Sequence, residues 1–128
     1  MNREIIFRGQ AFGTREWVYG NLRRREDGGN FIENMDGKHC FPVLPETIGQ
    51  FTGLYDKNGT KIYEGDIIKG EYEYAHLIRY NNDRAQFTAT LLSYVGDIME
   101  RSWEGACEQR WIDEFNKEII GNIHDKCY

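Results

Sequence analysis

The sequence predicts a mainly β protein of sandwich or barrel topology with one short helix, and three observations support this. Short runs rich in Ile, Val, Phe, Trp and Tyr recur along the 128 residues, separated by Gly, Asn and Asp about every ten residues. The dipeptide Asn58-Gly59 lies between two such runs and favours a β-hairpin. One segment, Glu104 to Phe115, has the hydrophobic spacing of a short helix instead. Hydrophobic residues make up 40% of the chain, enough for one sizeable core or two small packed halves.

Residues 1–46 are predicted to form an N-terminal β-hairpin region. Its first runs are "REIIFRG" and "REWVYGNL", and the two-residue period of a strand puts Trp17 and Tyr19 on one face and Val18 on the other. The segment "REDGGN" then closes a hairpin. Pro42 and Pro45 cannot both lie in a central strand, so we place a boundary before residue 47.

Residues 47–128 are predicted to form a second β region. "IGQFTGLYD" and "TKIYEGDIIKG" flank Asn58-Gly59, which favours a two-residue type I′ turn. The next run, "EYEYAHLIRY", mixes polar and apolar residues on both faces, so its inward face stays open. "NNDR" predicts a turn into the strand "AQFTATLL".

The C-terminal part is predicted to form one helix and one closing strand. Between residues 104 and 115, helical spacing groups the apolar side chains of Cys107, Trp111, Ile112 and Phe115, which would cover the sheet. "EIIGNI" then predicts a strand with a bulge or a close backbone approach at Gly121.

The stretch from Thr47 to Gly70 holds five of the chain's fourteen glycines and raises the question of a phosphate site. No GxxxxGK[ST] pattern is present, so the amides and helix dipole of a phosphate loop are not assembled. We interpret the glycines as turn formers and predict a structural signature. Its residues are Gly53, Asn58, Gly59, Gly65, Asp66 and Gly121.

Metal binding and catalysis are weakly indicated. His39, Cys40, His124 and Cys127 are of zinc-binding types, but adjacent strand residues point apart and the CxxC spacing is absent. No GxSxG elbow is present, although His and Cys side chains could still meet in space. We therefore predict no catalytic residues, no metal and no cofactor.

The charge and the cysteines narrow the class of protein. A net charge of −5 disfavours general nucleic-acid binding. The segment "MNREIIFRGQAFG" lacks the apolar centre of a signal peptide, no run is long enough to cross a bilayer, and three widely spaced cysteines fit free thiols. We expect a cytoplasmic protein without a membrane partner.

One basic cluster stands out. The arginines at positions 23, 24 and 25, together with Arg15, could contact an acidic partner or a phosphate backbone, although Glu26 and Asp27 dilute their charge. A solvated hairpin tip is the alternative. The candidate binding surface consists of Arg15, Trp17, Tyr19, Arg23, Arg24 and Arg25.

The segment "IGQFTGLYDKNGTKIYEGDII" resembles the signature of the YopX-like family of phage and prophage proteins. "REIIFRG", "EWVYGNL" and "EIIGNIHD" also resemble family segments, in the family's order, over nearly the whole chain. The ending departs from the family, in which an Asn-Pro-Glu run commonly follows the last strand, because "KCY" follows Asp125 here.

This resemblance implies a mostly β fold in which residues 47–128 form an SH3-like barrel region, a phage or prophage origin, self-association and no established activity. Two hypotheses follow. The first is a non-enzymatic accessory protein that binds itself and a host or phage protein. The second is a small barrel that binds nucleic acid, because the basic cluster of Arg15 and Arg23 to Arg25 lies near Trp17 and Tyr19 in the sequence. An enzyme comes third, and a pocket that gathers His39, Cys40, His124 or Cys127 would support it.

Overall fold

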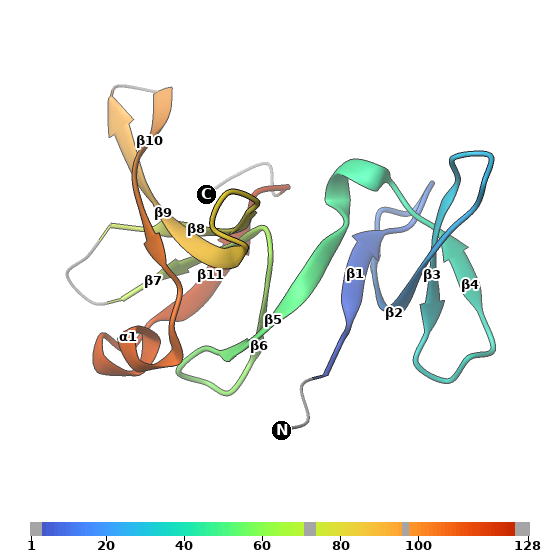
Figure 1. The fold of residues 1–128 in the computed structure, drawn as a ribbon, viewed down its shortest axis with the longest axis horizontal. Coiled ribbons are helices and arrows are strands. Elements are labelled where there is room, and N and C mark those ends of the chain that lie inside the picture. The colour runs from blue at the N-terminus through green and yellow to red at the C-terminus, as the bar shows by residue number, and fades with distance from the viewer. Residues whose placement is uncertain (1–3, 71–73, 96–97, 125–128) are drawn as a thin grey trace. The chain divides into compact units, whose positions relative to one another are not determined.

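The computed structural model describes residues 4–70, 74–95 and 98–124, and within these ranges the side chains of all but 93–95 and 98–103. The described residues form eleven strands, one α-helix and one 3-10 helix (Figure 1). The elements are β1 (Phe7–Gln10), β2 (Trp17–Arg24), β3 (Asn30–Asn34), β4 (Cys40–Pro42), the 3-10 helix η1 (Pro45–Thr47), β5 (Gly49–Tyr55), β6 (Lys61–Tyr63), β7 (Asp66–Lys69), β8 (His76–Asn81), β9 (Gln86–Val95), β10 (Ile98–Ala106), α1 (Gln109–Glu114) and β11 (Glu118–Asn122).

The chain divides into two compact units, Met1–Phe51 and Thr52–Tyr128. The predicted boundary, between residues 46 and 47, lies a short distance before this division. One sheet has the strand order β4-β3-β2-β1-β5-β6, and the division falls inside β5. The start of β5 pairs with β1 in the first unit, and Thr52 of β5 donates a side-chain hydrogen bond to the carbonyl of Ile62 in the second.

The first unit buries one face of its sheet. Ile32 is 0% exposed and Val43 is 1% exposed, and the backbone of Gly9 packs directly against both. The sheet curls, so that the end of β1 meets the segment after β4 through a bridge between Ala11 and Val43. The Leu44 N–H also donates to the Gln10 carbonyl at 2.9 Å. These contacts join one edge of the sheet to its middle.

The edge strand β4 is also covered at Pro42. The carbonyl of Pro42 accepts the Phe12 N–H at 3.0 Å, and proline has no N–H of its own to offer. The outward backbone of Pro42 is therefore left without an open donor or acceptor for a further strand.

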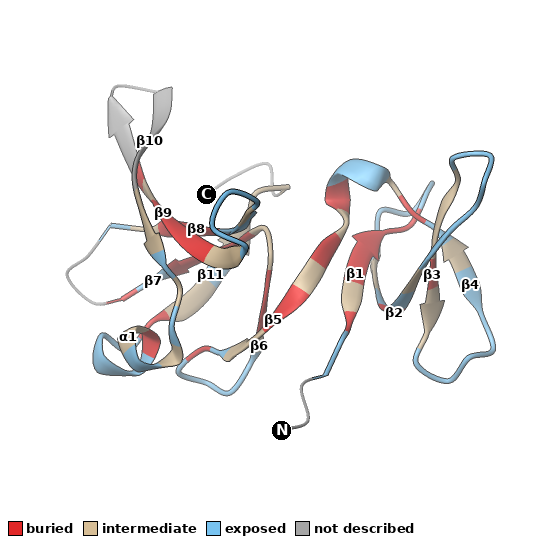
Figure 2. Cartoon of the chain, viewed as in Figure 1, coloured by how far each residue is buried: buried red, intermediate tan, exposed pale blue. Residues whose placement is uncertain are grey.

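The second unit contains a five-stranded antiparallel sheet in the order β10-β9-β8-β7-β11. Buried residues run along β7, β8 and the described part of β9 (Figure 2), and strand alternation places them on both faces of the sheet. One cluster joins Ile62, Ile68, Ile78 and Ala89 to Ile112 of α1, and the other contains Ile67, Leu77 and Leu92. The strand β8 is thus apolar on both sides, which explains why its pattern does not reveal an inward face.

The prediction of a mainly β fold with one short helix is confirmed. Both sheets are open among the described residues, so the predicted SH3-like barrel is not confirmed. The bulge at Gly121 is confirmed, because the register of β11 against β7 shifts between Ile119 and Gly121. The part of "EYEYAHLIRY" at residues 71–73 lies outside the described residues.

The predicted helix from Glu104 to Phe115 is too long. Residues Glu104 to Ala106 continue β10 and pair with Thr88, Ala89 and Thr90 of β9, and α1 spans only Gln109–Glu114. The backbone N–H and C=O groups of these residues form the hydrogen-bond ladder with β9, so they cannot also form the hydrogen bonds of a helix. The helix does cover the sheet, because Ile112 is 0% exposed in the main cluster.

The predicted hairpin at Asn58-Gly59 is confirmed, but its predicted type I′ turn is wrong. A type I′ turn needs positive φ at both central residues, whereas Gly59 has φ +78° and Asn58 is not among the positive-φ residues. Instead, the loop runs from Asp56 to Thr60. The carboxylate of Asp56 accepts the N–H groups of Asn58 and Thr60 at 2.9 Å each, and these bonds shape the loop.

Within the described part of the chain, no helix is long and apolar enough to span a membrane.

Candidate functional site

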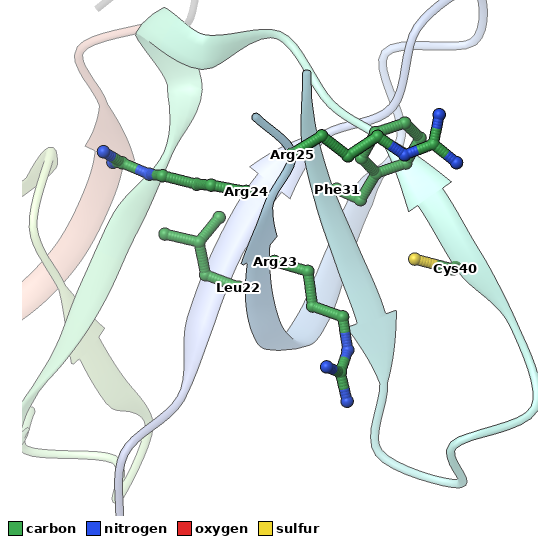
Figure 3. Close-up of a pocket in the computed structure, with 6 residues that line it drawn as sticks. All are labelled: Leu22, Arg23, Arg24, Arg25, Phe31 and Cys40. Atoms are coloured by element: carbon green, nitrogen blue, oxygen red, sulfur yellow. The ribbon is translucent and has the colours of Figure 1, made fainter. Parts of the chain in front are cut away.

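The candidate surface is centred on strand β2, whose alternating side chains separate the predicted residues onto two faces. Trp17, Tyr19 and Arg23 lie on the same face. Figure 3 shows Leu22 and Arg24 pointing to one side of β2 and Arg23 to the other. Arg24 therefore does not join the other predicted residues.

The hairpin between β2 and β3 positions Arg25 and brings Phe31 to this face. The Arg25 N–H donates to the Gly29 carbonyl, and Asp27 Oδ1 accepts the Gly29 N–H at 3.0 Å, which closes the turn. The resulting register puts Arg23 directly opposite Phe31. We call the residues gathered here the arginine face: Trp17, Tyr19, Arg23, Arg25 and Phe31.

A glycine keeps β2 and β3 close enough for this register. A Cβ atom at Gly20 would overlap the backbone carbonyl of Glu33 on β3. No side chain other than hydrogen fits at Gly20 while the ladder is intact.

An ion pair lies on the arginine face. Arg23 donates from Nε to Glu33 Oε2 at 2.8 Å and from Nη2 to Oε1 at 3.3 Å, the two-point geometry that guanidinium and carboxylate groups favour. This hydrogen bond and the charge of Glu33 raise the pKa of Arg23 above its usual value. The Arg23 side chain remains 61% exposed, so the pair is open to solvent.

Two aromatic rings of the face are covered by guanidinium groups. The Arg25 guanidinium lies 4.6 Å from the ring centre of Phe31, and that of Arg8 on β1 lies 4.4 Å from the ring of Trp17. Such stacking leaves the N–H donors at the rim of the exposed Arg25 guanidinium open to a further acceptor, whereas Arg8 is 6% exposed and out of reach. The Tyr19 ring is 42% exposed.

A hollow of about 540 Å³ lies around this hairpin, lined by Leu22, Arg23, Arg24, Arg25, Phe31 and Cys40 (Figure 3). Its lining comes from both sides of β2 and is mostly exposed, so it cannot enclose a small molecule. The hollow is suited to a macromolecular contact rather than to a buried ligand.

The strand pairings bring Trp17, Tyr19, Arg23 and Arg25 of the predicted surface onto one face and leave two predicted residues outside it. Arg15 lies in the loop between β1 and β2 with φ +59° and is not brought to the arginine face by any strand pairing. Arg8, Phe31 and Glu33 were not anticipated. Counting residues back from the "REDGGN" turn would have paired Arg23 with Phe31.

The predicted structural signature belongs to the second unit, whereas the arginine face belongs to the first. Gly53, Gly59 and Gly65 have positive φ, and Asp66 is buried and accepts the Tyr63 N–H at 2.7 Å. The neighbouring Asp56 connects three segments, because its Oδ2 also accepts the Ile119 N–H of β11 at 3.1 Å. This part of the sequence maintains the fold.

The metal-binding candidates are not gathered into a site by the described residues. Cys40 is exposed, and His39 stacks on Phe41 with ring centres 6.1 Å apart. The His124 N–H donates to Asn122, and Cys127 lies outside the described residues. Among the residues described, no group of three or more His, Cys, Asp and Glu side chains could hold a metal ion.

Two potentially reactive groups of the second unit pack near residues of α1, the half-buried Cys107 and the buried Lys117. Burial raises the pKa of the Cys107 thiol to about 12, with a smaller contribution from the charge of Glu108. Lys117 is 0% exposed, its Nζ lies 4.4 Å from the ring centre of Trp111, and burial lowers its pKa. A nucleophile must be both ionised correctly and accessible, so neither group is arranged for chemistry here.

The charge of the chain is distributed unequally between the units. Residues 1–51 contain seven basic and seven acidic residues, whereas residues 52–128 contain nine basic and fourteen acidic residues. The entire net charge of −5 therefore belongs to the second unit. The arginine face lies in a unit without net charge, where it can attract anionic groups locally.

Comparison with known proteins gives one family. The family model described as YopX protein matches residues 7–127, nearly the whole chain. No curated protein matches the sequence.

Proposed function

The chain belongs to the YopX family, and on that premise we propose that it is a non-enzymatic accessory protein of a phage or prophage that associates with itself and with another protein. We place it in the cytoplasm of the bacterial host, with no cofactor and no membrane partner. The single observation that carries the protein-binding function is the arginine face, where exposed arginines and aromatic rings alternate on one sheet. Arginine, tyrosine and tryptophan are the residues most enriched in binding hot spots.

The finer fold assignment belongs to the same proposal. In the five-stranded sheet of the second unit, the last strand of the chain, β11, pairs with β7. On the other side of β7 the strands β8, β9 and β10 follow in chain order. This order is the one an SH3-like barrel needs before it closes, and it supports that assignment for Thr52–Tyr128.

The alternative is a nucleic-acid-binding module. Arginine and aromatic side chains side by side favour it, because single strands bind through phosphate contacts and base stacking. The covered rings of Phe31 and Trp17 weigh against it, since a base needs a free ring face. The net charge of −5 also weighs against it.

Affinity purification from infected or lysogenic cells tests the protein-binding function. The bait is the full chain, compared with a double variant, Tyr19→Ala with Arg25→Ala, and with a matched control in the second unit, Tyr74→Ala with Arg110→Ala, which removes one exposed tyrosine and one exposed arginine. We expect a protein partner that the control retains and the double variant loses. Partners retained equally by all three baits, or nuclease-sensitive recovery, would contradict the proposal, and sedimentation of the purified chain tests self-association.

A further inference from the structure

We propose that the arginine face binds an acidic protein segment whose carboxylates take the place of Glu33 on Arg23. This inference rests on the proposed protein-binding function and names the chemistry of the partner. It begins from the pair already present, in which the face holds a carboxylate through two hydrogen bonds of 2.8 and 3.3 Å. The Glu33 carboxylate thus shows how Arg23 would bind a carboxylate of the partner.

The second step concerns the exchange of carboxylates. The Arg23 side chain is 61% exposed and that of Glu33 is 25% exposed, so an incoming carboxylate can reach the guanidinium while Glu33 remains on the sheet. An exposed ion pair adds little to stability because water screens it, so its exchange has a small cost. Glu33 acts as a weak internal competitor for the partner.

The third step concerns the choice between carboxylates and bases. Arg25 stacks on Phe31 at 4.6 Å and Arg8 on Trp17 at 4.4 Å, so guanidinium groups cover one face of each ring. Arg25 is exposed and still presents its coplanar N–H donors, whose spacing matches a carboxylate, whereas the buried Arg8 only covers its ring. The face therefore offers carboxylate sites and few stacking platforms.

The fourth step concerns long-range charge. A polyanion as dense as nucleic acid is repelled by the −5 net charge of the chain, whereas a segment with a few carboxylates is repelled less. The first unit itself has equal numbers of acidic and basic residues. A partner with modest negative charge fits this balance.

The test measures fluorescence anisotropy at low salt with two labelled probes, a peptide of about ten residues of Glu and Ser, and an oligo-dT of equal net charge. We expect the peptide to bind the full chain more tightly than the oligo-dT. Arg25→Ala should weaken peptide binding by roughly tenfold, the loss typical of a charged hydrogen bond. Glu33→Gln should strengthen it several-fold because it removes the internal competitor.

The second unit offers a matched control for the Glu33 variant. Arg110 and Glu114 form an exposed pair at 3.2 Å on α1, so Glu114→Gln changes the net charge by the same amount and also releases an arginine. We expect Glu114→Gln to leave peptide binding unchanged. An equal gain from both variants would mean unspecific attraction and would overturn the inference.

Two further outcomes would also overturn it: no peptide binding at all, or tighter binding of oligo-dT that Arg25→Ala abolishes. The second outcome would instead support the nucleic-acid module. If the peptide does not bind but a protein partner is still lost with the Tyr19 and Arg25 double variant, the inference fails and the proposed function stands. Circular dichroism of each variant verifies that the fold is retained.

Discussion

The two units of this protein divide scaffold and surface between them. The second unit, Thr52–Tyr128, contains the glycine-rich signature, buried clusters on both faces of its sheet and all the net negative charge. The first unit, Met1–Phe51, has a smaller core and presents the arginine face. The most recognisable segment of the sequence is thus the one that holds the fold, and the candidate for function lies in the less distinctive segment.

The largest effect is expected in the first unit, from Gly20→Ala. The added methyl group would overlap the Glu33 carbonyl, so β2 and β3 must separate, at a cost of roughly 4 kcal/mol in the free energy of unfolding. Hydrogen exchange of the β2 and β3 amides measures this loss. Gly28→Ala, at φ +94° with nothing within 4 Å, should cost only about 1 kcal/mol. Similar exchange in both variants would show that the close approach does not limit this unit.

The second prediction concerns Asp56, which should be the most sensitive side chain of the second unit. Asp56→Ala leaves the N–H groups of Asn58, Thr60 and Ile119 without their acceptor, and we expect a loss of about 3 kcal/mol. Alkylation of Cys107 in a chain carrying Cys40→Ser and Cys127→Ser reports the opening of this unit, because Cys107 is half-buried against the cluster that contains Ile112 and burial raises the pKa of its thiol. Asp83→Ala, in an exposed turn, is the control and should leave the rate unchanged.

Gly65→Val is expected to have the next largest effect. Gly65 has φ +95°, its N–H donates to the Ile78 carbonyl at 2.7 Å and its carbonyl accepts the Ile123 N–H at 2.8 Å. A β-branched residue at this φ should cost about 2 kcal/mol. The thermal midpoint should fall accordingly and recover in part with Gly65→Asn, because Asn tolerates positive φ. A midpoint equal to that of the wild type would refute the role assigned to Gly65.

The smallest effect is a pH dependence that should be confined to the second unit. Burial lowers the pKa of His76 below its usual 6.5, so the folded state favours the neutral imidazole. Its contribution to stability is complete above about pH 6.5 and declines as the pH falls, because the unfolded chain then binds the proton more readily. Urea unfolding at pH 7.5 and 5.5 measures the decline, which His76→Gln should reduce. His39→Gln, in the first unit, should leave it unaltered.

Local patterns predicted those elements whose backbone hydrogen bonds are made between neighbouring segments. The "REDGGN" and Asn58-Gly59 hairpins are of this kind. The closing strand β11 pairs with the much earlier strand β7, and its own apolar run and Gly121 predicted it. The start of α1 was misplaced because pairing with the preceding strand β9 holds Glu104 to Ala106 in β10, and the helical spacing of the apolar residues does not reveal that pairing. The turn type was wrong because Asp56, just before the dipeptide, directs the loop.

The arginine-rich composition of the candidate site predicted a basic surface, and the strand register determines which side chains share one face of it. Neighbouring arginines pointed to a basic surface, but only strand alternation separates Arg24 from Arg23 (Figure 3). The partners that define the chemistry, Glu33 and Phe31, come from the other strand of the hairpin. A single sequence without strand pairing could not show that one of the arginines already holds a carboxylate.

The covered edge at Pro42 has a consequence for aggregation. Exposed sheet edges recruit strands from other molecules and can grow into fibrils, and proline on an edge strand is one of the ways in which proteins prevent this. At β4, proline lacks the donor and Phe12 occupies the acceptor, so this edge cannot template a further strand there. Copies of this chain that meet at Pro42 must therefore recognise each other there through side chains and not through a continued β-ladder.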